Sequence, residues 1–371
     1  MSFPRSGQIF FSRFARDGGG RELALPSRAG SKDGDWQDWR WQYARRLRRP
    51  EELARFQGGD GERQEEWRRV GARYPFAVTP YYLSLLDPTD ENDPLRRQCW
   101  PDIRELGDAG GCGQEDPLEE DRHMPVPGLI RRYPDRCLVL ATNRCAVFCR
   151  HCNRKRFWRQ SPRRFSRSYF RRIIDRIARE PDLREVIVSG GDALMMSDEA
   201  LDWLLSSLRD IPHVEVVRIG SRAPAVLPMR VSPELVAVLK RHRPLWFNTQ
   251  FNHPREITAE AARACELLLS AGIPVSNQAV LLRGINDDED TLRELFYGLQ
   301  RISVRPYYLF SCDPVRGTGH FQVDTMRGAA TMDRLRRRIS GLCLPRYVLD
   351  SPGEGGKIPL DASPTGYHAG G

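Results

Sequence analysis

The sequence predicts an α/β fold with a parallel sheet, built either as a doubly wound sheet or as a partial barrel. After Pro134, short β-branched runs alternate with longer amphipathic segments, and loops containing Gly and Asp follow the runs. Six strand-then-helix units in series favour parallel strands joined by right-handed crossovers. No internal repeat points to a solenoid.

The chain divides into four parts by composition. Residues 1–35 are rich in Gly, Ser and Arg without periodicity, which predicts a loose tail. Residues 36–125 carry apolar residues at helical spacing up to about Arg73 and then a loop rich in Asp, Pro and Gly, which predicts a helical N-terminal region. Residues 126–315 hold the strand-and-helix core, and residues 316–371 form a C-terminal segment.

Polar motifs follow the predicted strands of the core. The strands are expected at 137–142, 185–190, 214–221, 245–249, 274–280 and 304–310. The helices are expected near 166–180, 198–209, 232–242, 257–271, 289–301 and 325–341. SGGD, GSRAP, FNHPRE, LLRGIND and CDP come directly after the second to sixth strands. Because active sites form at the carboxyl ends of parallel strands, this arrangement favours an enzyme with a barrel-like mouth.

Charge and hydropathy narrow the class of protein. The 371-residue chain has a net charge of +9 and a pI near 9.2, but its arginines are scattered rather than gathered into one basic stripe. We therefore expect no nucleic-acid partner. The longest apolar runs fall far short of the roughly 20 residues of a membrane span, and the N-terminus lacks the apolar stretch of a signal peptide. These features predict a soluble, cytoplasmic protein without a membrane partner.

Three of the nine cysteines lie together in TNRCAVFCRHCNRKRF, directly after the first core strand. A structural zinc site normally takes four ligands, often as CxxC pairs, and no second pair exists here. The C-x3-C-x2-C spacing of Cys145, Cys149 and Cys152 instead suits three corners of a [4Fe–4S] cube, leaving one iron open to another ligand. The remaining cysteines are interpreted as core residues or incidental thiols: Cys99, Cys112, Cys137, Cys265, Cys312 and Cys343.

A second cofactor is indicated by one of the four lysines. Lys357 alone lies in a glycine-rich loop, LDSPGEGGKIPLD, whose spacing does not fit a phosphate-binding P-loop. Pyridoxal phosphate (PLP) needs a flexible lysine for covalent attachment and small neighbours for close approach. Arg132, Tyr133 and Arg136, in RRYPDR, are predicted to hold the PLP phosphate and to pack beside its ring.

The cysteine spacing is similar to the signature of the radical S-adenosylmethionine (SAM) superfamily. The resemblance implies that the three cysteines ligate the cluster, that SAM chelates the open iron, and that its reductive cleavage yields a 5′-deoxyadenosyl radical. It also implies an electron donor such as flavodoxin or ferredoxin. The strand end SGGD resembles the superfamily's GGE motif, and the implied cofactor contacts are Ser189, Gly190, Gly191, Asp192 and Gln278.

A larger part of the chain, roughly 36–361, resembles the lysine 2,3-aminomutase family of PLP-dependent radical SAM enzymes. The resemblance is carried by TPYYLSLLDPTDENDP, VPGLIRRYPDR, CRHCNRKRF, SGGDALMMSDE, RIGSRAPAVLP, FNHPREIT, NQAVLLRGIND, VRPYYLFSCD and LDSPGEGGKIP. It implies a partial (β/α)6 barrel with a helical N-terminal extension. The implied activity is that of an isomerase, which converts L-lysine to β-lysine by a SAM-derived radical and a PLP-mediated 1,2-amino migration.

The same resemblance assigns roles to individual residues. Lys357 matches the PLP lysine, Arg154 the ligand of the substrate α-carboxylate, and Asp313 and Asp350 the acceptors of the distal ammonium. A guanidinium fork suits a carboxylate, and two carboxylates suit a partly desolvated ammonium. A glutamate-specific relative would replace the two aspartates with neutral or cationic residues, so glutamate is disfavoured.

Several alternatives stay open at this stage. Arginine and ornithine also carry a distal cation, and some relatives act on a lysine destined for elongation factor P. A radical SAM enzyme without PLP and a noncatalytic iron–sulfur protein that binds nucleic acid are more distant hypotheses. Longer family members carry a C-terminal arm with zinc-binding cysteines, whereas this chain stops at Gly371. We therefore expect no zinc, and a homo-oligomer would use other surfaces.

Overall fold

The computed structural model describes residues 33–57, 61–107, 113–160 and 166–361. Its strands join one nine-stranded sheet, in which the spatial order follows the chain order. Strands β2 to β8 run parallel, while β1 and β9 pair antiparallel with β2 and β8 at the two ends. The strands are β1 (Leu129–Ile130), β2 (Arg136–Thr142), β3 (Glu185–Gly190), β4 (Val216–Gly220), β5 (Leu245–Thr249), β6 (Val275–Leu281), β7 (Arg305–Ser311), β8 (Arg346–Asp350) and β9 (Lys357–Pro359).

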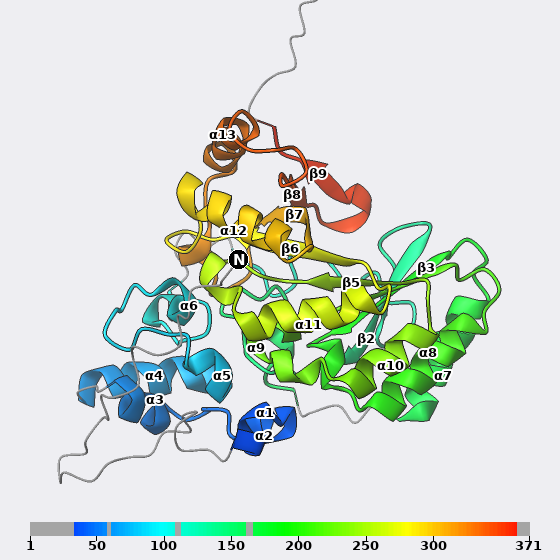
Figure 1. Ribbon diagram of the computed structural model, residues 1–371, viewed down its shortest axis with the longest axis horizontal. Coiled ribbons are helices and arrows are strands. Elements are labelled where there is room, and N and C mark those ends of the chain that lie inside the picture. The colour runs from blue at the N-terminus through cyan, green and yellow to red at the C-terminus, as the bar shows by residue number, and fades with distance from the viewer. Residues whose placement is uncertain (1–32, 58–60, 108–112, 161–165, 362–371) are drawn as a thin grey trace, which may run out of the picture.

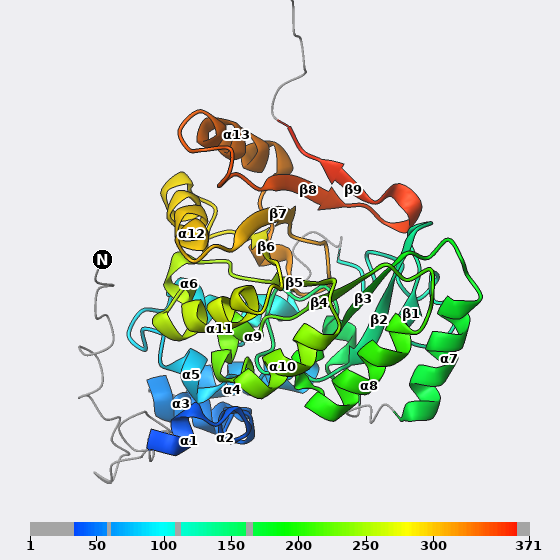
Figure 2. The same cartoon turned by 45° about the vertical axis from the view of Figure 1, so that its right-hand side comes forward.

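The order of the strands decides between the two predicted architectures. A doubly wound sheet reverses its strand order at a switch point, whereas this order runs without a reversal. The helices that follow the strands line one face of the curved sheet (Figures 1 and 2). No ladder joins β1 to β9 among the described strands, so the sheet is a partial barrel, as predicted.

Each strand from β2 to β7 is followed by a helix that packs outside the sheet. The starts of these helices are set by capping side chains: Ser197, Ser232 and Thr258 each accept a hydrogen bond from the backbone N–H three residues further on. The helices of this layer are α7 (Arg167–Ala178), α8 (Asp198–Arg209), α9 (Ala223–Val226), α10 (Pro233–Arg241), α11 (Ala259–Ser270), α12 (Glu289–Arg301) and α13 (Thr325–Arg336).

Short helices precede the sheet and pack away from β8 and β9 (Figure 1). They are tied to the core by side chains, since Thr79 Oγ1 donates to the Val226 carbonyl at 2.7 Å and Tyr82 Oη donates to Glu256 at 2.7 Å. The predicted domain boundaries after residues 35, 125 and 315 stay predictions. These helices are α1 (Asp33–Gln37), α2 (Trp39–Ala44), α3 (Pro50–Gln57), α4 (Gly61–Arg73), α5 (Pro80–Leu83) and α6 (Pro94–Arg97).

Side chains along each strand point alternately to the apolar core and to the interior of the barrel, where polar and apolar residues are mixed. In β3, Val186 and Val188 are fully buried in the apolar core, whereas Ile187 and Ser189 line a cavity inside the barrel. Arg218 on β4 also faces this cavity. The period of two therefore places polar side chains such as Ser189 and Arg218 inside the barrel without disturbing the core.

The described cysteines outside the cluster motif are buried, in agreement with the prediction that they are core residues: Cys99, Cys137, Cys265, Cys312 and Cys343. Cys112 lies outside the described residues. None of the described helices combines the length and the apolar character that a membrane span requires.

A buried ionic network fixes the cysteine loop to the N-terminal region. Glu105, which lies in a 3-10 turn (Ile103–Leu106), accepts hydrogen bonds from Arg150 at 2.7 and 2.9 Å and from Lys155 at 2.8 Å. All three side chains are almost completely buried. Burial lowers the pKa of Lys155 to about 8, although Glu105 raises it, so the ammonium depends on its carboxylate partner.

We expect the Glu105→Gln substitution to lower the free energy of unfolding by about 3–5 kcal/mol, because two buried cations would lose their counter-charge. Chemical denaturation of the protein before cofactor loading measures the change. The matched control is Glu115→Gln, because Glu115 pairs with Arg316 at 2.9 Å on the surface. That change should cost less than about 1 kcal/mol. Equal losses in the two variants would contradict the prediction.

Candidate active site

One cavity of about 830 Å³ occupies the interior of the barrel. It is lined by nearly all the residues that the sequence predicts for the site: Tyr133, Arg136, Cys145, Cys149, Cys152, Arg154, Ser189, Gly190, Gly191, Asp192, Gln278, Asp313, Asp350 and Lys357. Arg132 is the one predicted residue that does not line it. The three cysteines and the loop lysine therefore share one cavity, as a common site requires.

The cysteine loop between β2 and α7 is held by the N-terminal helices. Arg46 Nη1 donates to the carbonyl oxygen of Cys145 at 2.6 Å, and the backbone N–H of Arg150 donates to the carbonyl oxygen of Gln98 at 2.8 Å. The N–H of Cys152 donates to the carbonyl of Cys149 at 2.8 Å, which closes a turn between these two ligands. The predicted ligands are thus positioned by the fold and not only by their spacing.

The thiols of the loop form a donor set that fits a metal cluster. Burial raises the pKa of Cys145 well above its ordinary value, and burial together with the Cys149 thiol raises the pKa of Cys152 to about 11. Deprotonating these buried thiols therefore costs free energy. Metal binding offsets that cost because thiolates are the ligating form. No group of three or more His, Cys, Asp or Glu in the described ranges is placed to hold a single ion, whereas a cube provides a separate iron for each sulfur.

Two glycines at the end of β3 allow a close approach to the cysteine loop. Gly190 has a φ of 127°, and a Cβ atom there would lie 2.2 Å from the carbonyl oxygen of Thr142. A Cβ atom on Gly191 would lie 2.4 Å from the carbonyl oxygen of Arg144. Only glycine fits at either position, so the predicted SGGD motif has a steric basis in this structure.

Asp192, a predicted cofactor contact, is already engaged by the protein. Its carboxylate accepts hydrogen bonds from the Ser221 hydroxyl at 2.6 Å and from the backbone N–H groups of Leu194 and Arg222 at 3.0 and 2.9 Å. Burial raises the pKa of Asp192, while these donors lower it. The carboxylate joins the ends of β3 and β4, and in this structure it braces the mouth of the barrel.

His151 is a cavity residue that the sequence analysis did not assign. Burial lowers the pKa of its imidazole well below the ordinary value, so the ring is neutral. Its Nε2 lies 3.2 Å from the side-chain nitrogen of Gln250, and its Nδ1 has no hydrogen-bond partner in the part of the chain that the structure describes. A buried ring nitrogen without a partner, on a residue that lines the cavity, fits a ligand with hydrogen-bonding groups, such as SAM.

Lys357 lies at the start of β9, opposite Asp350 of β8 in the antiparallel register. Its Nζ donates to Tyr133 Oη at 3.2 Å and lies 5.8 Å from the ring centres of both Tyr308 and Phe310. Gly356, with φ of 67°, lets the loop approach the Tyr133 ring, because a Cβ atom there would lie 3.2 Å from it. This aromatic-walled lysine fits PLP, whose planar ring needs flat neighbours.

The arginines predicted to hold the PLP phosphate differ in their surroundings. Arg136 lines the cavity and stacks on Tyr133, with 3.7 Å between its guanidinium carbon and the ring centre. Arg132 lies behind the cavity wall, where it pairs with Asp350 at 3.2 Å and donates to the carbonyls of Ser351 and Gly353. Arg132 therefore braces the loop that carries Lys357.

Arg154, the predicted ligand of the substrate carboxylate, is paired with an acid that sequence reasoning missed. Its Nε and Nη2 donate to both carboxylate oxygens of Glu120, with the shortest contact at 2.6 Å. Its Nη1 lies 3.5 Å from the carbonyl oxygen of Gly190 at the cavity wall. Arg156 also donates to Glu120, at 2.9 Å. Glu120 fixes the plane of the Arg154 guanidinium and leaves one edge toward the cavity.

Asp313 and Asp350 both line the cavity but differ in charge balance. Asp350 pairs with Arg132, whereas no described cationic side chain forms an ion pair with Asp313. Burial and the nearby Asp350 carboxylate raise the pKa of Asp313 to about 7, although a hydrogen bond from Asn153 lowers it. Asp313 therefore has no ion-pair partner within the part of the chain that the structure describes.

Two of the residues that were missed differ in how well the sequence could have indicated them. Arg222, whose Nη1 donates to the Sγ of Cys149 at 2.7 Å, belongs to GSRAP. This motif comes directly after a strand, and that position was a usable signal. Glu120 lies in an irregular acidic loop, EEDRH, where no pattern distinguishes it from its neighbours. Only the tertiary structure brings Glu120 to Arg154.

The class of enzyme follows from the similarity of this chain to known proteins. Residues 139–296 match the family model described as the radical SAM superfamily, which implies a [4Fe–4S] cluster and SAM in a site that fits both. The chain is 49% identical to L-lysine 2,3-aminomutase of Clostridium subterminale over 328 residues, which are 88% of this chain and 79% of that protein. It therefore belongs to the lysine 2,3-aminomutase family and is an isomerase.

Two further relatives are named for different substrates. The chain is 48% identical over 326 residues to L-lysine 2,3-aminomutase of Acetoanaerobium sticklandii, covering 88% of this chain and 78% of that protein. It is 41% identical over 328 residues to glutamate 2,3-aminomutase of Clostridioides difficile, covering 88% and 77%. This chain is thus similar to enzymes named for two different amino acids, so the similarity alone does not fix its substrate.

Proposed function

We propose that this enzyme is an amino-acid 2,3-aminomutase that converts L-lysine to β-lysine, using PLP in addition to the cluster and SAM. The assignment of lysine as the substrate rests on Asp313. This residue is a carboxylate in the shared cavity with a raised pKa and no ion-pair partner among the described residues. The distal ammonium of lysine supplies the missing cation. The distal carboxylate of glutamate would instead add a third negative charge beside Asp313 and Asp350.

Each residue of the site is proposed to act in binding or positioning. Arg154, oriented by Glu120, offers its Nη1 edge to the substrate α-carboxylate. Asp313 and Asp350 receive the distal ammonium at the other end of the substrate. The distance between these anchors selects the chain length, so the reacting carbons are held between the two cofactors.

Lys357 is the proposed attachment point of PLP. The Tyr133 hydroxyl, 3.2 Å from Nζ, is placed to hold a proton beside that amine, and Arg136 is the proposed ligand of the phosphate. When bound, the cluster and SAM supply a 5′-deoxyadenosyl radical, and PLP supplies the aldehyde that carries the migrating amino group. An external flavodoxin or ferredoxin is the proposed source of the electron. The enzyme is proposed to act either as a monomer or as a homo-oligomer.

Arginine and ornithine are the main alternative substrates, because both also carry a distal cation. Anaerobic reconstitution with iron, sulfide, PLP and SAM, followed by assays on lysine, arginine, ornithine and glutamate, tests the proposal. We expect the highest kcat/KM for lysine and the lowest for glutamate. A preference for glutamate would overturn the substrate assignment, and the absence of turnover on all four would overturn the proposed reaction.

The charge state of Asp313 predicts a pH dependence. Its pKa is raised from 3.8 to about 7, so the carboxyl group is neutral below pH 7 and attracts a substrate ammonium only above it. We expect kcat/KM for lysine to rise as the pH passes upward through about 7 and then to level off. The charged groups that act on Asp313 are Asp350, Glu120 and Arg132.

The Asp313→Asn variant should lose this rise while its kcat/KM at high pH falls. Asp290→Asn is the control, because Asp290 lies on the surface of α12 and pairs only with Arg293 in the described contacts. Its pH profile should match that of the unmodified enzyme. A rise through pH 7 that persists in Asp313→Asn would assign the titration to another group.

A further inference from the structure

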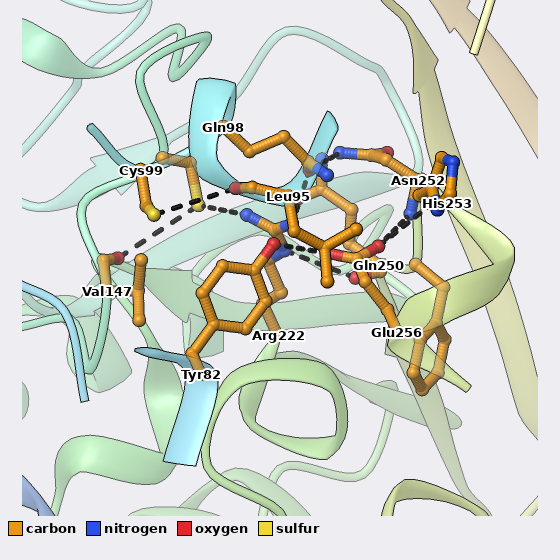
Figure 3. Close-up of polar contacts among 12 residues, drawn as sticks. Tyr82, Leu95, Gln98, Cys99, Val147, Arg222, Gln250, Asn252, His253 and Glu256 are labelled. Atoms are coloured by element: carbon orange, nitrogen blue, oxygen red, sulfur yellow. Dashed lines mark hydrogen bonds and ion pairs between the residues drawn. The ribbon is translucent and has the colours of Figure 1, made fainter. Parts of the chain in front are cut away.

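The guanidinium of Arg222 contacts a predicted cluster ligand directly. Arg222 follows β4, and its Nη1 donates a hydrogen bond to the Sγ of Cys149 at 2.7 Å. Figure 3 shows Arg222 at the centre of a group of polar contacts. The side chain of Arg222 is itself only 7% exposed, so water does not weaken this contact.

The remaining donors of Arg222 are occupied by the protein, which fixes the guanidinium plane. Nη2 donates to Gln98 Oε1 and to Glu256 Oε1, both at 2.6 Å, and Nε donates to the carbonyl of Gln250 at 3.3 Å. The backbone N–H of Arg222 donates to Asp192 at 2.9 Å. Because these contacts hold the guanidinium at its other nitrogens, it cannot rotate Nη1 away from Cys149 without breaking several hydrogen bonds.

Glu256 balances the charge of Arg222 through Nη2, the nitrogen that does not contact the sulfur. Its carboxylate accepts hydrogen bonds from Tyr82 Oη at 2.7 Å and from the backbone N–H groups of Asn252 and His253 at 2.6 and 3.0 Å. Its side chain is fully buried. These contacts hold Glu256 in place, as Figure 3 shows, and so anchor the arginine between a carboxylate and a thiol.

The three ligands are not treated alike by the protein. In the described contacts, Cys149 receives a cationic side chain, whereas the Cys152 sulfur receives only the backbone N–H of Arg154, at 3.3 Å. Arg46 contacts the carbonyl of Cys145 rather than its sulfur. A charge-assisted hydrogen bond to a ligating sulfur stabilises the more negative, reduced state of an iron–sulfur cluster.

We propose that Arg222 is a positioning residue that raises the reduction potential of the cluster through its hydrogen bond to Cys149. In the reduction, the oxidised cluster gains one electron from an external low-potential donor, while the guanidinium keeps its protons and no covalent bond forms or breaks. The inference rests on the cluster that the family implies and is independent of the substrate proposed above. It adds to the site a residue outside the cysteine motif that acts on the metal.

The test is an anaerobic redox titration of the reconstituted cluster, followed by EPR without SAM or amino acid. We expect Arg222→Gln to make the midpoint potential more negative by about 59 mV, which is a tenfold loss in the one-electron reduction equilibrium constant. Because this variant leaves Glu256 buried without its partner, the double variant Arg222→Gln/Glu256→Gln is measured as well. It removes both charges and should shift the potential in the same direction.

Arg230→Lys is the matched control. Arg230 is also a buried arginine near β4, but its donors contact Asp198 and the carbonyls of Leu194 and Met196. Its variant should keep the original potential. An unchanged or more positive potential in both Arg222 variants would overturn the proposal. Loss of the cluster from both, with normal iron content in Arg230→Lys, would also overturn the proposal, because Arg222 would then be required for cluster assembly rather than for the potential. The readout needs no turnover, so failure of the lysine assay would leave this result standing.

Discussion

Replacing Lys357 with arginine is expected to abolish turnover while the iron–sulfur cluster still assembles. Arginine keeps the positive charge beside Tyr133 and Asp350, but its guanidinium does not form the covalent link to PLP that an amine forms. The loss should therefore be complete rather than partial. Activity on lysine, together with the EPR spectrum of the reduced cluster, measures the two effects separately.

A direct readout of PLP attachment accompanies the activity assay. Borohydride reduction followed by peptide mass spectrometry should place the cofactor on the peptide that contains residue 357 and on no other. Lys240→Arg serves as the control, because Lys240 lies exposed in the last turn of α10. It should keep both labelling and turnover. Labelling of Lys155 or Lys240 in the original enzyme would contradict the assignment of Lys357.

Elements with a strong local pattern could be predicted closely from the sequence. The strand at 245–249 and the helices at 198–209 and 289–301 have the predicted bounds. Their ends carry local signals, such as Ser197 and Asp288, which cap α8 and α12. Hydrophobic periodicity and capping act within a few residues, so one sequence is enough to recognise them.

Strands that depend on distant partners were missed. Strand β8 (Arg346–Asp350) runs parallel to β7, and β9 (Lys357–Pro359) folds back on β8. The local sequence predicts only a lysine-bearing loop in this region. Both strands are short, and their glycine-rich connection hides any alternation of apolar residues. Their pairing with the sheet stabilises them, and that pairing is a tertiary property.

The site shows the same division between local and distant information. The cysteine spacing and the loop around Lys357 are local patterns, and the structure brings both to one cavity. The partners of these residues are distant in sequence, as the pairs of Glu120 with Arg154 and of Arg222 with Cys149 show. Chemistry could thus be predicted from residue types, whereas the hydrogen bonds that orient it required the fold.

Asp350 connects substrate recognition to the PLP loop, and its removal is the second large effect that we expect. Its carboxylate pairs with Arg132 at 3.2 Å and lies 4.0 Å from Lys357 Nζ. The Asp350→Asn variant keeps the shape but loses the charge that attracts the distal ammonium. We expect kcat/KM for lysine to fall at least about 30-fold, the equivalent of about 2 kcal/mol for truncating one partner of a buried charge pair.

The variant must separate loss of recognition from damage to the loop. If Asp350 acts on the substrate ammonium, Asp350→Asn should keep the cluster spectrum and the covalent PLP label while it loses activity on lysine, arginine and ornithine alike. If its pairing with Arg132 only braces the loop, the PLP label should fall together with the activity. Asp361→Asn, an exposed change that loosens only the pair with Arg336, should alter none of these readouts. Unchanged kinetics on lysine in Asp350→Asn would refute the proposed recognition of the ammonium, because a carboxylate that contributes nothing to binding cannot select the substrate.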